Sequence, residues 1–346
     1  MSQTMSDKPV RVAVVGVGDF GRNHVRVWRE TEGAELVGIV DTNAERAQKI
    51  AAEFGTRVLH DLDALTSDGV HAVSLAVPTA EHARIGSRIL AAGIDVLVEK
   101  PIAASLAEAD ALIACAKRGN CILQVGHLER FNPAVVAVKK IVSRPMFFEV
   151  HRLGIFSPRS LDIDVVYDVM IHDLDILLSL VAAPVVDLKA VGIPVISDKV
   201  DIAHARLEFE TGTVANLTAS RVSTERVRKM RFFQEHEYIS LDFTRQDVLR
   251  VRVESSGASA ATQLAAASEI NAPQPKIGFE KVATTPEEPL RAELRSFLES
   301  VRTSKQPLVD GPAGRRALEL ADRVMAGILE HARHVQLSSF VPQDAR

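Results

Sequence analysis

The segment VAVVGVGDFG, residues 12–21, narrows the possible folds of this chain more than any other stretch. It places Gly16, Gly18 and Gly21 in G-x-G-x-x-G spacing, after an apolar run and before a helical pattern. The first glycine permits a tight turn, the second lets a ligand approach the backbone, and the third lets the helix pack closely on the strand. Exposed N–H groups at the start of such a helix bind phosphates. The spacing predicts a strand–turn–helix unit that binds a dinucleotide, although a tight turn without a ligand would use the same glycines.

Short apolar runs alternate with helical patterns through the first third of the chain. The predicted strands are VRVAVVG, ELVGIVD, HAVSLAV, IDVLVE and CILQVG, and amphipathic patterns lie between several of them. This alternation is typical of a doubly wound parallel sheet covered on both faces. The length of 346 residues favours two domains. We therefore predict an NAD-binding Rossmann domain over residues 1–126.

The pattern changes after residue 126. An apolar segment over 164–181 predicts a helix, and alternating segments from DLKAVGIPVI to DVLRVRVE predict consecutive strands. Strands without intervening helices indicate an antiparallel sheet. We predict an α+β domain over residues 127–346, with a large, open, mostly antiparallel sheet. Residues 255–289 are rich in small and turn-forming residues, which predicts a long loop or lid, or partial disorder.

Composition excludes several classes of partner. The formal net charge of −4 gives no electrostatic reason to expect nucleic acid or an anionic membrane surface. The first ten residues lack the apolar region of a secretory signal, and no long apolar run appears, so we expect a cytoplasmic protein. Cys115 and Cys121 do not form a metal or disulfide framework, and no metal site is expected.

Asp41 adds to the prediction of a dinucleotide site. It ends the second predicted strand, twenty residues after Gly21, where a carboxylate hydrogen-bonds a ribose 2′-hydroxyl and repels a 2′-phosphate. This favours NAD over NADP, although Asp41 would also serve as a helix cap. Further candidate cofactor contacts lie in the glycine-rich turn and at the carboxyl ends of the next strands. They are Asp19, Phe20, Pro78, Thr79, His82, Glu99 and Lys100.

Two segments carry candidate catalytic groups. VLVEKPIA ends a predicted strand with Glu99, Lys100 and Pro101, so that the lysine either points into the ligand site or extends to solvent. DVVYDVMIHDLDILLSLV, residues 164–181, carries polar residues on an otherwise apolar helix. Asp168 and His172 are four residues apart and would share one face of a regular α-helix. A structural helix whose polar side chains are hydrogen-bonded to other parts of the protein would show the same spacing.

Together, GVGDFG, the strand-ending Asp41, EKP and the D-x-x-x-H of YDVMIHDLD resemble the glucose–fructose oxidoreductase/inositol dehydrogenase (Gfo/Idh/MocA) family. The resemblance implies that Lys100, Asp168 and His172 surround the sugar carbon that is oxidised. His172 suits the role of proton acceptor, since its pKa is near neutrality, and Lys100 would stabilise a developing alkoxide. Which of the two takes the proton stays open.

VGHLERFNPAV and HRLGIFSPRS resemble a subgroup of the family that oxidises nucleotide sugars at C3. The resemblance implies UDP-N-acetylglucosamine as substrate, a role in lipid A and 3-amino sugar biosynthesis, and functional coupling to an aminotransferase. It also implies a homodimer or homotetramer formed through the C-terminal sheet. Arginine suits a diphosphate because guanidinium gives permanently charged, bidentate donors. The candidate substrate contacts are Lys100, His127, Arg130, Asn132, Arg152, Arg159, Asp168 and His172. Dehydrogenation of a free sugar or inositol, and non-catalytic dinucleotide sensing, are the alternatives.

Overall fold

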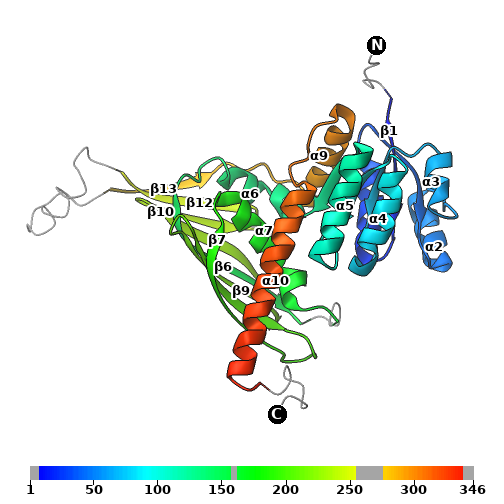
Figure 1. The fold of residues 1–346 in the computed structure, drawn as a ribbon. Helices are drawn as coiled ribbons and strands as arrows, with labels where there is room; N and C mark the ends of the chain where they lie inside the picture. Colours follow the sequence, from blue (N-terminus) through cyan, green and yellow to red (C-terminus); the bar gives the residue numbers. More distant parts are fainter. Residues whose placement is uncertain (1–7, 157–161, 255–275, 338–346) are drawn as a thin grey trace, which may run out of the picture. The chain divides into compact units, whose positions relative to one another are not determined.

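A computed structural model describes residues 8–156, 162–254 and 276–337. The chain forms two compact units (Figure 1). Unit 1 comprises residues Met1–Asn132, Ile171–Leu178 and Glu287–Arg323, and unit 2 comprises Pro133–Met170, Ser179–Pro286 and Val324–Arg346. Both units are therefore discontinuous in sequence. None of the helices in the described ranges is long and apolar enough to cross a membrane.

Unit 1 contains a five-stranded parallel sheet in the order β2-β1-β3-β4-β5. This confirms the predicted Rossmann sheet. The strands are β1 (Val10–Val15), β2 (Ala34–Val40), β3 (Ala72–Leu75), β4 (Asp95–Glu99) and β5 (Leu123–Gly126). The helices that follow or join them are α1 (Asp19–Glu30), α2 (Ala44–Phe54), α3 (Asp63–Ser67), η1 (Thr79–Glu81), α4 (His82–Ala91), α5 (Leu106–Gly119) and η2 (Leu128–Phe131).

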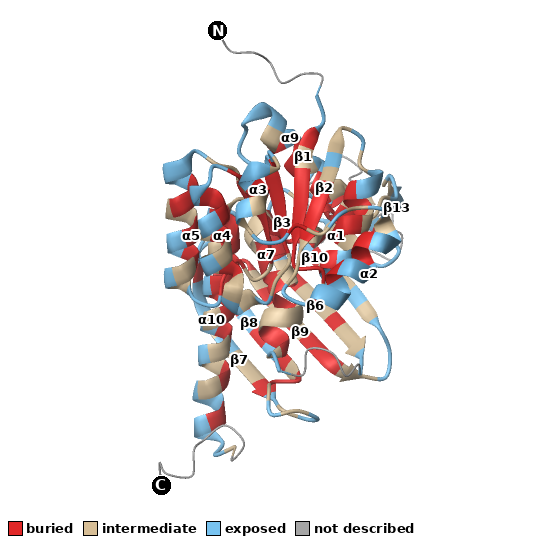
Figure 2. Ribbon diagram, turned by 90° about the vertical axis from the view of Figure 1, so that its right-hand side faces the viewer, coloured by how far each residue is buried: buried red, intermediate tan, exposed pale blue. Residues whose placement is uncertain are grey.

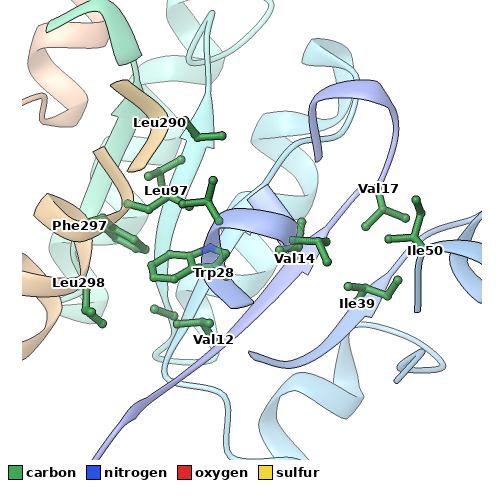
Figure 3. Close-up of a cluster of buried hydrophobic side chains, with 14 of the residues drawn as sticks. Val12, Val14, Val17, Trp28, Ile39, Ile50, Leu97, Leu290, Phe297 and Leu298 are labelled. Carbon is green, nitrogen blue, oxygen red and sulfur yellow. The ribbon is translucent and has the colours of Figure 1, made fainter. Parts of the chain in front are cut away.

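Apolar side chains from distant segments form the core of unit 1. Trp28 of α1 lies against Phe297 of helix α9 (Pro289–Thr303), with ring centroids 6.5 Å apart in an edge-on arrangement (Figure 3). The indole N–H of Trp28 donates to the Ser74 hydroxyl at 2.8 Å, so its one polar group is satisfied inside the core. The strands are buried along most of their length, as the red segments of Figure 2 show for β1 and β3. Burial on both faces explains why these strands are continuous apolar runs.

Unit 2 contains an eight-stranded mixed sheet in the order β13-β12-β11-β10-β6-β9-β8-β7. Only β6 and β9 pair in parallel among its described strands, so the predicted mostly antiparallel sheet is confirmed. The strands are β6 (Pro145–Ile155), β7 (Val185–Ile193), β8 (Ile202–Phe209), β9 (Val214–Ser223), β10 (Val227–Gln234), β11 (Glu237–Asp242), β12 (Asp247–Glu254) and β13 (Lys276–Val282). Helix α6 (Pro133–Val138) precedes them, and α10 (Gly311–His334) ends the described chain.

Two predicted elements need correction. Within the expected loop over 255–289, residues Lys276–Val282 form β13, which pairs with β12 along its length. The helix predicted over 164–181 is not a regular α-helix, because Val166–Met170 form a π-helical turn before α7 (Ile171–Leu180). A π turn widens the helix and changes the angular spacing of its side chains. The shared face predicted for Asp168 and His172 assumed a regular α-helix, and the π turn, which contains Asp168, departs from that geometry.

Candidate active site

The glycine-rich turn between β1 and α1 forms one wall of a pocket of about 740 Å³. Gly16 has φ of +85°, and a Cβ added to it would lie 2.6 Å from the carbonyl oxygen of Ala76. A Cβ at Gly21 would lie 1.9 Å from the carbonyl oxygen of Gly16. A Cβ at Gly18, in contrast, would have nothing within 4 Å in the described chain. Gly16 and Gly21 are therefore required by the protein's own packing, whereas the space at Gly18 is open for a ligand.

The pocket size and lining fit a dinucleotide. Sites for ligands of this kind in parallel α/β sheets lie at the carboxyl ends of the strands. The predicted contacts Gly16, Gly18, Asp19, Phe20, Asp41 and Pro78 all line the pocket. The other predicted contacts are not among its lining residues within the described ranges: Gly21, Thr79, His82, Glu99 and Lys100.

Asp41 is held firmly at the end of β2. Its carboxylate accepts hydrogen bonds from the N–H groups of Val17 and Asn43, both at 2.8 Å, and from the Arg46 guanidinium at 2.7 and 3.2 Å. Burial alone would raise the pKa of Asp41, but the bonds from Arg46, Val17 and Asn43 outweigh it and lower the pKa below its ordinary value. Asp41 is therefore an ionised carboxylate in a fixed position against the glycine-rich turn.

His82 has a different environment from the one expected of a cofactor ligand. Its ring is 1% exposed, with Nδ1 2.9 Å from the Pro101 carbonyl oxygen and Nε2 3.0 Å from that of Val77. Burial lowers the pKa of this imidazole, against the opposing effect of the two carbonyls. The ring links the end of β3 to the EKP turn, so its contacts connect it to the Lys100–Pro101 segment.

Glu99 is buried where β4 ends. Its Oε1 lies 3.0 Å from His24 Nε2, and the Lys100 backbone N–H donates to its Oε2 at 3.4 Å. A Cβ at Gly126 would overlap the same carboxylate, which explains the small residue at the end of β5. Lys100 is only partly exposed, and its peptide bond to Pro101 is cis.

His127 and His172 meet next to this turn, both within unit 1. Their ring centroids are 6.3 Å apart and the planes are perpendicular. Burial lowers the pKa of the His127 imidazole, and the positive charges of Lys100 and Arg130 lower it further. The negative charge of Asp175 partly offsets this decrease. A neutral imidazole at neutral pH follows from this environment. The charge of Lys100 thus acts on His127, which lies against His172, and groups of these kinds suit proton transfer to and from a hydroxyl group.

The other predicted substrate contacts have protein partners or lie outside the described residues. Arg130 is 9% exposed and its guanidinium forms an ion pair with Asp175 at 3.2 Å. The Asn132 amide donates to Glu129 at 3.0 Å. In unit 2, Arg152 is 4% exposed and stacks over the Phe243 ring at 4.8 Å, while Asp168 lies in the π turn. Arg159 lies outside the described residues.

Sequence reasoning missed three polar residues beneath this site. His24 of α1, Gln124 of β5 and Glu293 of α9 are all 0% exposed. Glu293 had a detectable signal, because Leu290, Leu294 and Phe297 define an apolar stripe on which it occupies an interior position. A carboxyl group at such a position is rare without a specific role or partner.

The parallel sheet, the glycine-rich turn and the fitted pocket define an oxidoreductase with an NAD(P)-binding Rossmann domain. A family model described as "Oxidoreductase family, NAD-binding Rossmann fold" matches residues 10–127, and the GFO/IDH/MocA C-terminal domain model matches residues 146–239. The chain belongs to the Gfo/Idh/MocA oxidoreductase family.

Relatives with known names support this assignment. UDP-N-acetylglucosamine 3-dehydrogenase of Acidithiobacillus ferrooxidans is 38% identical over 320 residues, which cover 92% of this chain and 97% of the relative. A solved structure of that enzyme superposes with a TM-score of 0.82, at 37% identity and the same coverage of both chains. 4-Carboxy-2-hydroxymuconate-6-semialdehyde dehydrogenase of a Sphingobium species is 31% identical over 61% of this chain and 72% of the relative.

Proposed function

We propose that this protein oxidises the C3 hydroxyl group of UDP-N-acetylglucosamine to a ketone, with NAD⁺ as the hydride acceptor. The observation that carries the proposal is the 38% identity to a UDP-N-acetylglucosamine 3-dehydrogenase over nearly the full length of both chains. Similarity of the Rossmann domain alone would not support a substrate, since one fold serves many reactions. The similarity here extends through the C-terminal domain as well.

When bound, NAD⁺ would supply the acceptor for the hydride from C3, and residues of the chain would take up the hydroxyl proton. His172 or Lys100 takes the proton, and the charge of the lysine favours the developing alkoxide over the alcohol. His127 lies against His172, and its environment includes Lys100, so it provides a second imidazole for the same proton. Asp168, four positions before His172 in the chain, would orient His172 or the substrate hydroxyl group.

The preference for NAD rests on Asp41. Its ionised carboxylate is fixed at the edge of the pocket, where it would disfavour the extra phosphate of NADP. Arg46 pairs with this carboxylate, so its positive charge is partly neutralised rather than available for a phosphate. We expect NAD⁺ to be used more efficiently than NADP⁺.

The proposed assembly is a homodimer or homotetramer formed through the sheet of unit 2. One face of that sheet carries Phe233, which is 39% exposed and lies against Phe147 and Tyr238 at centroid distances of 5.8 and 5.2 Å. An exposed aromatic cluster suits an interface. Lipid A biosynthesis and coupling to an aminotransferase are parts of the proposal that follow from the sequence resemblance.

The direct test measures NADH formation with UDP-N-acetylglucosamine, other UDP-sugars, free N-acetylglucosamine, hexoses and inositols, each with NAD⁺ and with NADP⁺. A carbonyl trap removes the keto product, because oxidation of an alcohol by NAD⁺ is commonly uphill. The proposal predicts the highest kcat/KM with UDP-N-acetylglucosamine and NAD⁺. Turnover of free sugars or inositols at a higher kcat/KM would contradict the substrate assignment, and no turnover with any compound would favour a dinucleotide sensor.

A further inference from the structure

Two short elements of unit 1, η2 and α7, contact each other through two pairs of side chains. His127, immediately before η2, lies against His172 of α7, with perpendicular rings and centroids 6.3 Å apart. Three residues further along each element, Arg130 pairs with Asp175, and its Nη1 lies 3.2 Å from Oδ1 of the carboxylate. Three residues are about one helical turn, so the ring contact and the ion pair lie on the same side of each element.

The backbone ties the ion pair to the ring contact on both elements. The Arg130 N–H donates to the His127 carbonyl oxygen at 2.9 Å, which closes a single turn between these two residues. On the other side, His172 and Asp175 belong to one continuous α-helix. A displacement of either charged side chain that moves its backbone would therefore also move the imidazole one turn before it.

The ion pair is buried. Arg130 is 9% exposed and Asp175 is 2% exposed. The second carboxylate oxygen of Asp175, Oδ2, has no hydrogen-bond partner in the described part of the chain. Loss of Arg130 would therefore leave a buried carboxylate without compensation. A charge-assisted hydrogen bond is also stronger and more directional than an edge contact between two rings. Of the two contacts, the ion pair is thus the one that can fix the position of η2 against α7.

The two charges of the pair act on His127 in opposite directions. Burial lowers the pKa of His127 most, Asp175 raises it, and Lys100 and Arg130 lower it. Glu99, at the end of β4, also raises it. Because the members of the pair oppose each other at the ring, their main joint contribution is the position of the ring and not its charge.

We propose that Arg130 and Asp175 are positioning residues for the proposed reaction. Their ion pair holds η2 against α7, so that the two imidazoles keep the mutual contact in which they handle the hydroxyl proton. The inference rests on the proposed function, because it needs an alcohol substrate whose proton the imidazoles accept. It gives Arg130 a different role from the substrate contact expected from the sequence, since its guanidinium is buried against a carboxylate.

The kinetic test is a double-mutant cycle with Arg130→Met and Asp175→Asn, measured as kcat and KM for UDP-N-acetylglucosamine at saturating NAD⁺. Each single variant should lower kcat about 10- to 100-fold, as for a misplaced catalytic group, with KM changed less than about threefold. The double variant should be no slower than the slower single variant, because both substitutions remove the same contact. Arg130→Lys keeps the charge but not the planar guanidinium, and its kcat should lie between those of the wild type and Arg130→Met.

Other kinetic outcomes would overturn the proposal. A KM that rises at least about tenfold in Arg130→Met at unchanged kcat would make this residue a substrate contact. Multiplied losses of kcat in the double variant would show that the two residues act independently. Lower thermal stability at unchanged kcat would show that the pair is only structural. We expect that last pattern for the matched control Arg221→Met, because Arg221 forms a buried ion pair with Asp201 at 2.7 Å in unit 2.

A spectroscopic test needs no substrate. In ¹H–¹³C spectra of histidine-labelled protein, His127→Gln and His172→Gln assign the two ring signals, and the wild type should show a nuclear Overhauser effect between them. Asp175→Asn keeps the side-chain size and Arg130→Lys keeps the charge, so both are mild changes, and each should shift the signals and weaken the effect. Unchanged signals in both variants, or no effect in the wild type, would contradict the positioning role. If the wild type shows the ring contact but does not oxidise UDP-N-acetylglucosamine, the proposed function fails instead.

Discussion

Gly16 and Gly18 belong to one motif but meet different local requirements. Gly16 combines a left-handed φ of +85° with contact against the Ala76 carbonyl, so any side chain there is strained and crowded. Gly18 has an ordinary φ of −63° and open space around its missing side chain. The protein's own packing therefore requires the first glycine, whereas we expect the second to be needed for the ligand.

We therefore expect Gly18→Ala to separate cofactor binding from stability. Its free energy of unfolding should stay within about 0.5 kcal/mol of the wild type, as for other substitutions without new contacts. The dinucleotide Kd should rise at least about tenfold, or about 1.4 kcal/mol, because a methyl group would occupy the approach to the pyrophosphate. Urea unfolding and fluorescence titration with NADH measure the two quantities.

Two outcomes would contradict this reading of Gly18. An unchanged Kd would remove Gly18 from the cofactor contact, and a large loss of stability would show a packing role. Gly16→Ala and Gly93→Ala form a useful pair, because both have positive φ but only Gly16 is crowded. We expect Gly16→Ala to destabilise the protein more.

In the proposed reaction, Lys100 is the residue on which we expect the chemical step to depend most. Lys100→Ala should reduce kcat about 10²- to 10⁴-fold, because the variant loses the positive charge beside the alkoxide and a candidate proton acceptor. The Kd for NADH should change little, since Lys100 does not line the described pocket. Steady-state kinetics and NADH titration check both expectations, with the exposed Lys117→Ala as control. Turnover at the wild-type rate would exclude this lysine from the mechanism.

For single residues, sequence patterns predicted those that belong to a motif of fixed spacing. They missed residues whose surroundings depend on tertiary contacts. The glycines and Asp41 were predictable because a strand–turn–helix motif fixes their relative positions. The two carbonyl partners of His82 were not predictable, because Val77 follows β3 and Pro101 lies in the EKP turn, and only the folded sheet brings them together. Glu293 was missed because its neighbours Glu99, Gln124 and Asp175 come from three other segments of the chain.

The loop between β7 and β8 shows how one buried carboxylate stabilises an irregular element. Asp201 is 0% exposed, and its carboxylate accepts hydrogen bonds of 2.7 to 3.0 Å from three backbone N–H groups, those of Val195, Ile196 and Ser197. The Arg221 guanidinium adds a bond at 2.7 Å. Burial alone would raise the pKa of Asp201, but these backbone and Arg221 bonds lower it far below its ordinary value.

Asp201→Asn should therefore destabilise the protein by about 3–5 kcal/mol at pH 7, because the buried Arg221 guanidinium would lose the negative charge that lies 2.7 Å from it. The depressed pKa makes the contribution of Asp201 fully present above the unfolded-state pKa of about 3.9, and it declines as the pH falls below that value. The difference in unfolding free energy between wild type and variant should shrink accordingly between pH 6 and pH 3, as urea titrations at each pH would show. The exposed Asp198→Asn is the control. A difference that does not change with pH would contradict the role of the ionised carboxylate.

Helices and strands with a clear repeat of apolar residues were predicted better than elements whose conformation depends on contacts with neighbouring elements. Strands buried on both faces appear in the sequence as continuous apolar runs. Their alternation with helical patterns was enough to predict a parallel sheet. The strand β13, KIGFEKV, is short and follows a segment rich in small residues, and its pairing with β12 completes the edge of the sheet. The π turn before α7 inserts an extra residue into a helical pattern, and a 3.6-residue period cannot represent it.

At the scale of the whole molecule, the exposed aromatic cluster of unit 2 predicts self-association. Phe233→Glu should convert a dimer or tetramer to smaller species, because a charge within an apolar interface is costly to desolvate. Light scattering after size-exclusion chromatography measures the mass, and Leu308→Glu, at an exposed position of unit 1, is the control. A wild-type monomer, or a Phe233→Glu variant of unchanged mass, would contradict the proposed interface.

The central claim is that the hydride removed by this protein comes from C3 of UDP-N-acetylglucosamine. The most direct measurement incubates the protein and NAD⁺ with substrate deuterated at C3 only, and follows the label by mass spectrometry and NMR. The account predicts deuterium at C4 of the reduced nicotinamide, together with a 3-keto sugar nucleotide. Reduced cofactor without deuterium, or deuterium retained in the sugar while oxidation proceeds elsewhere, would contradict it.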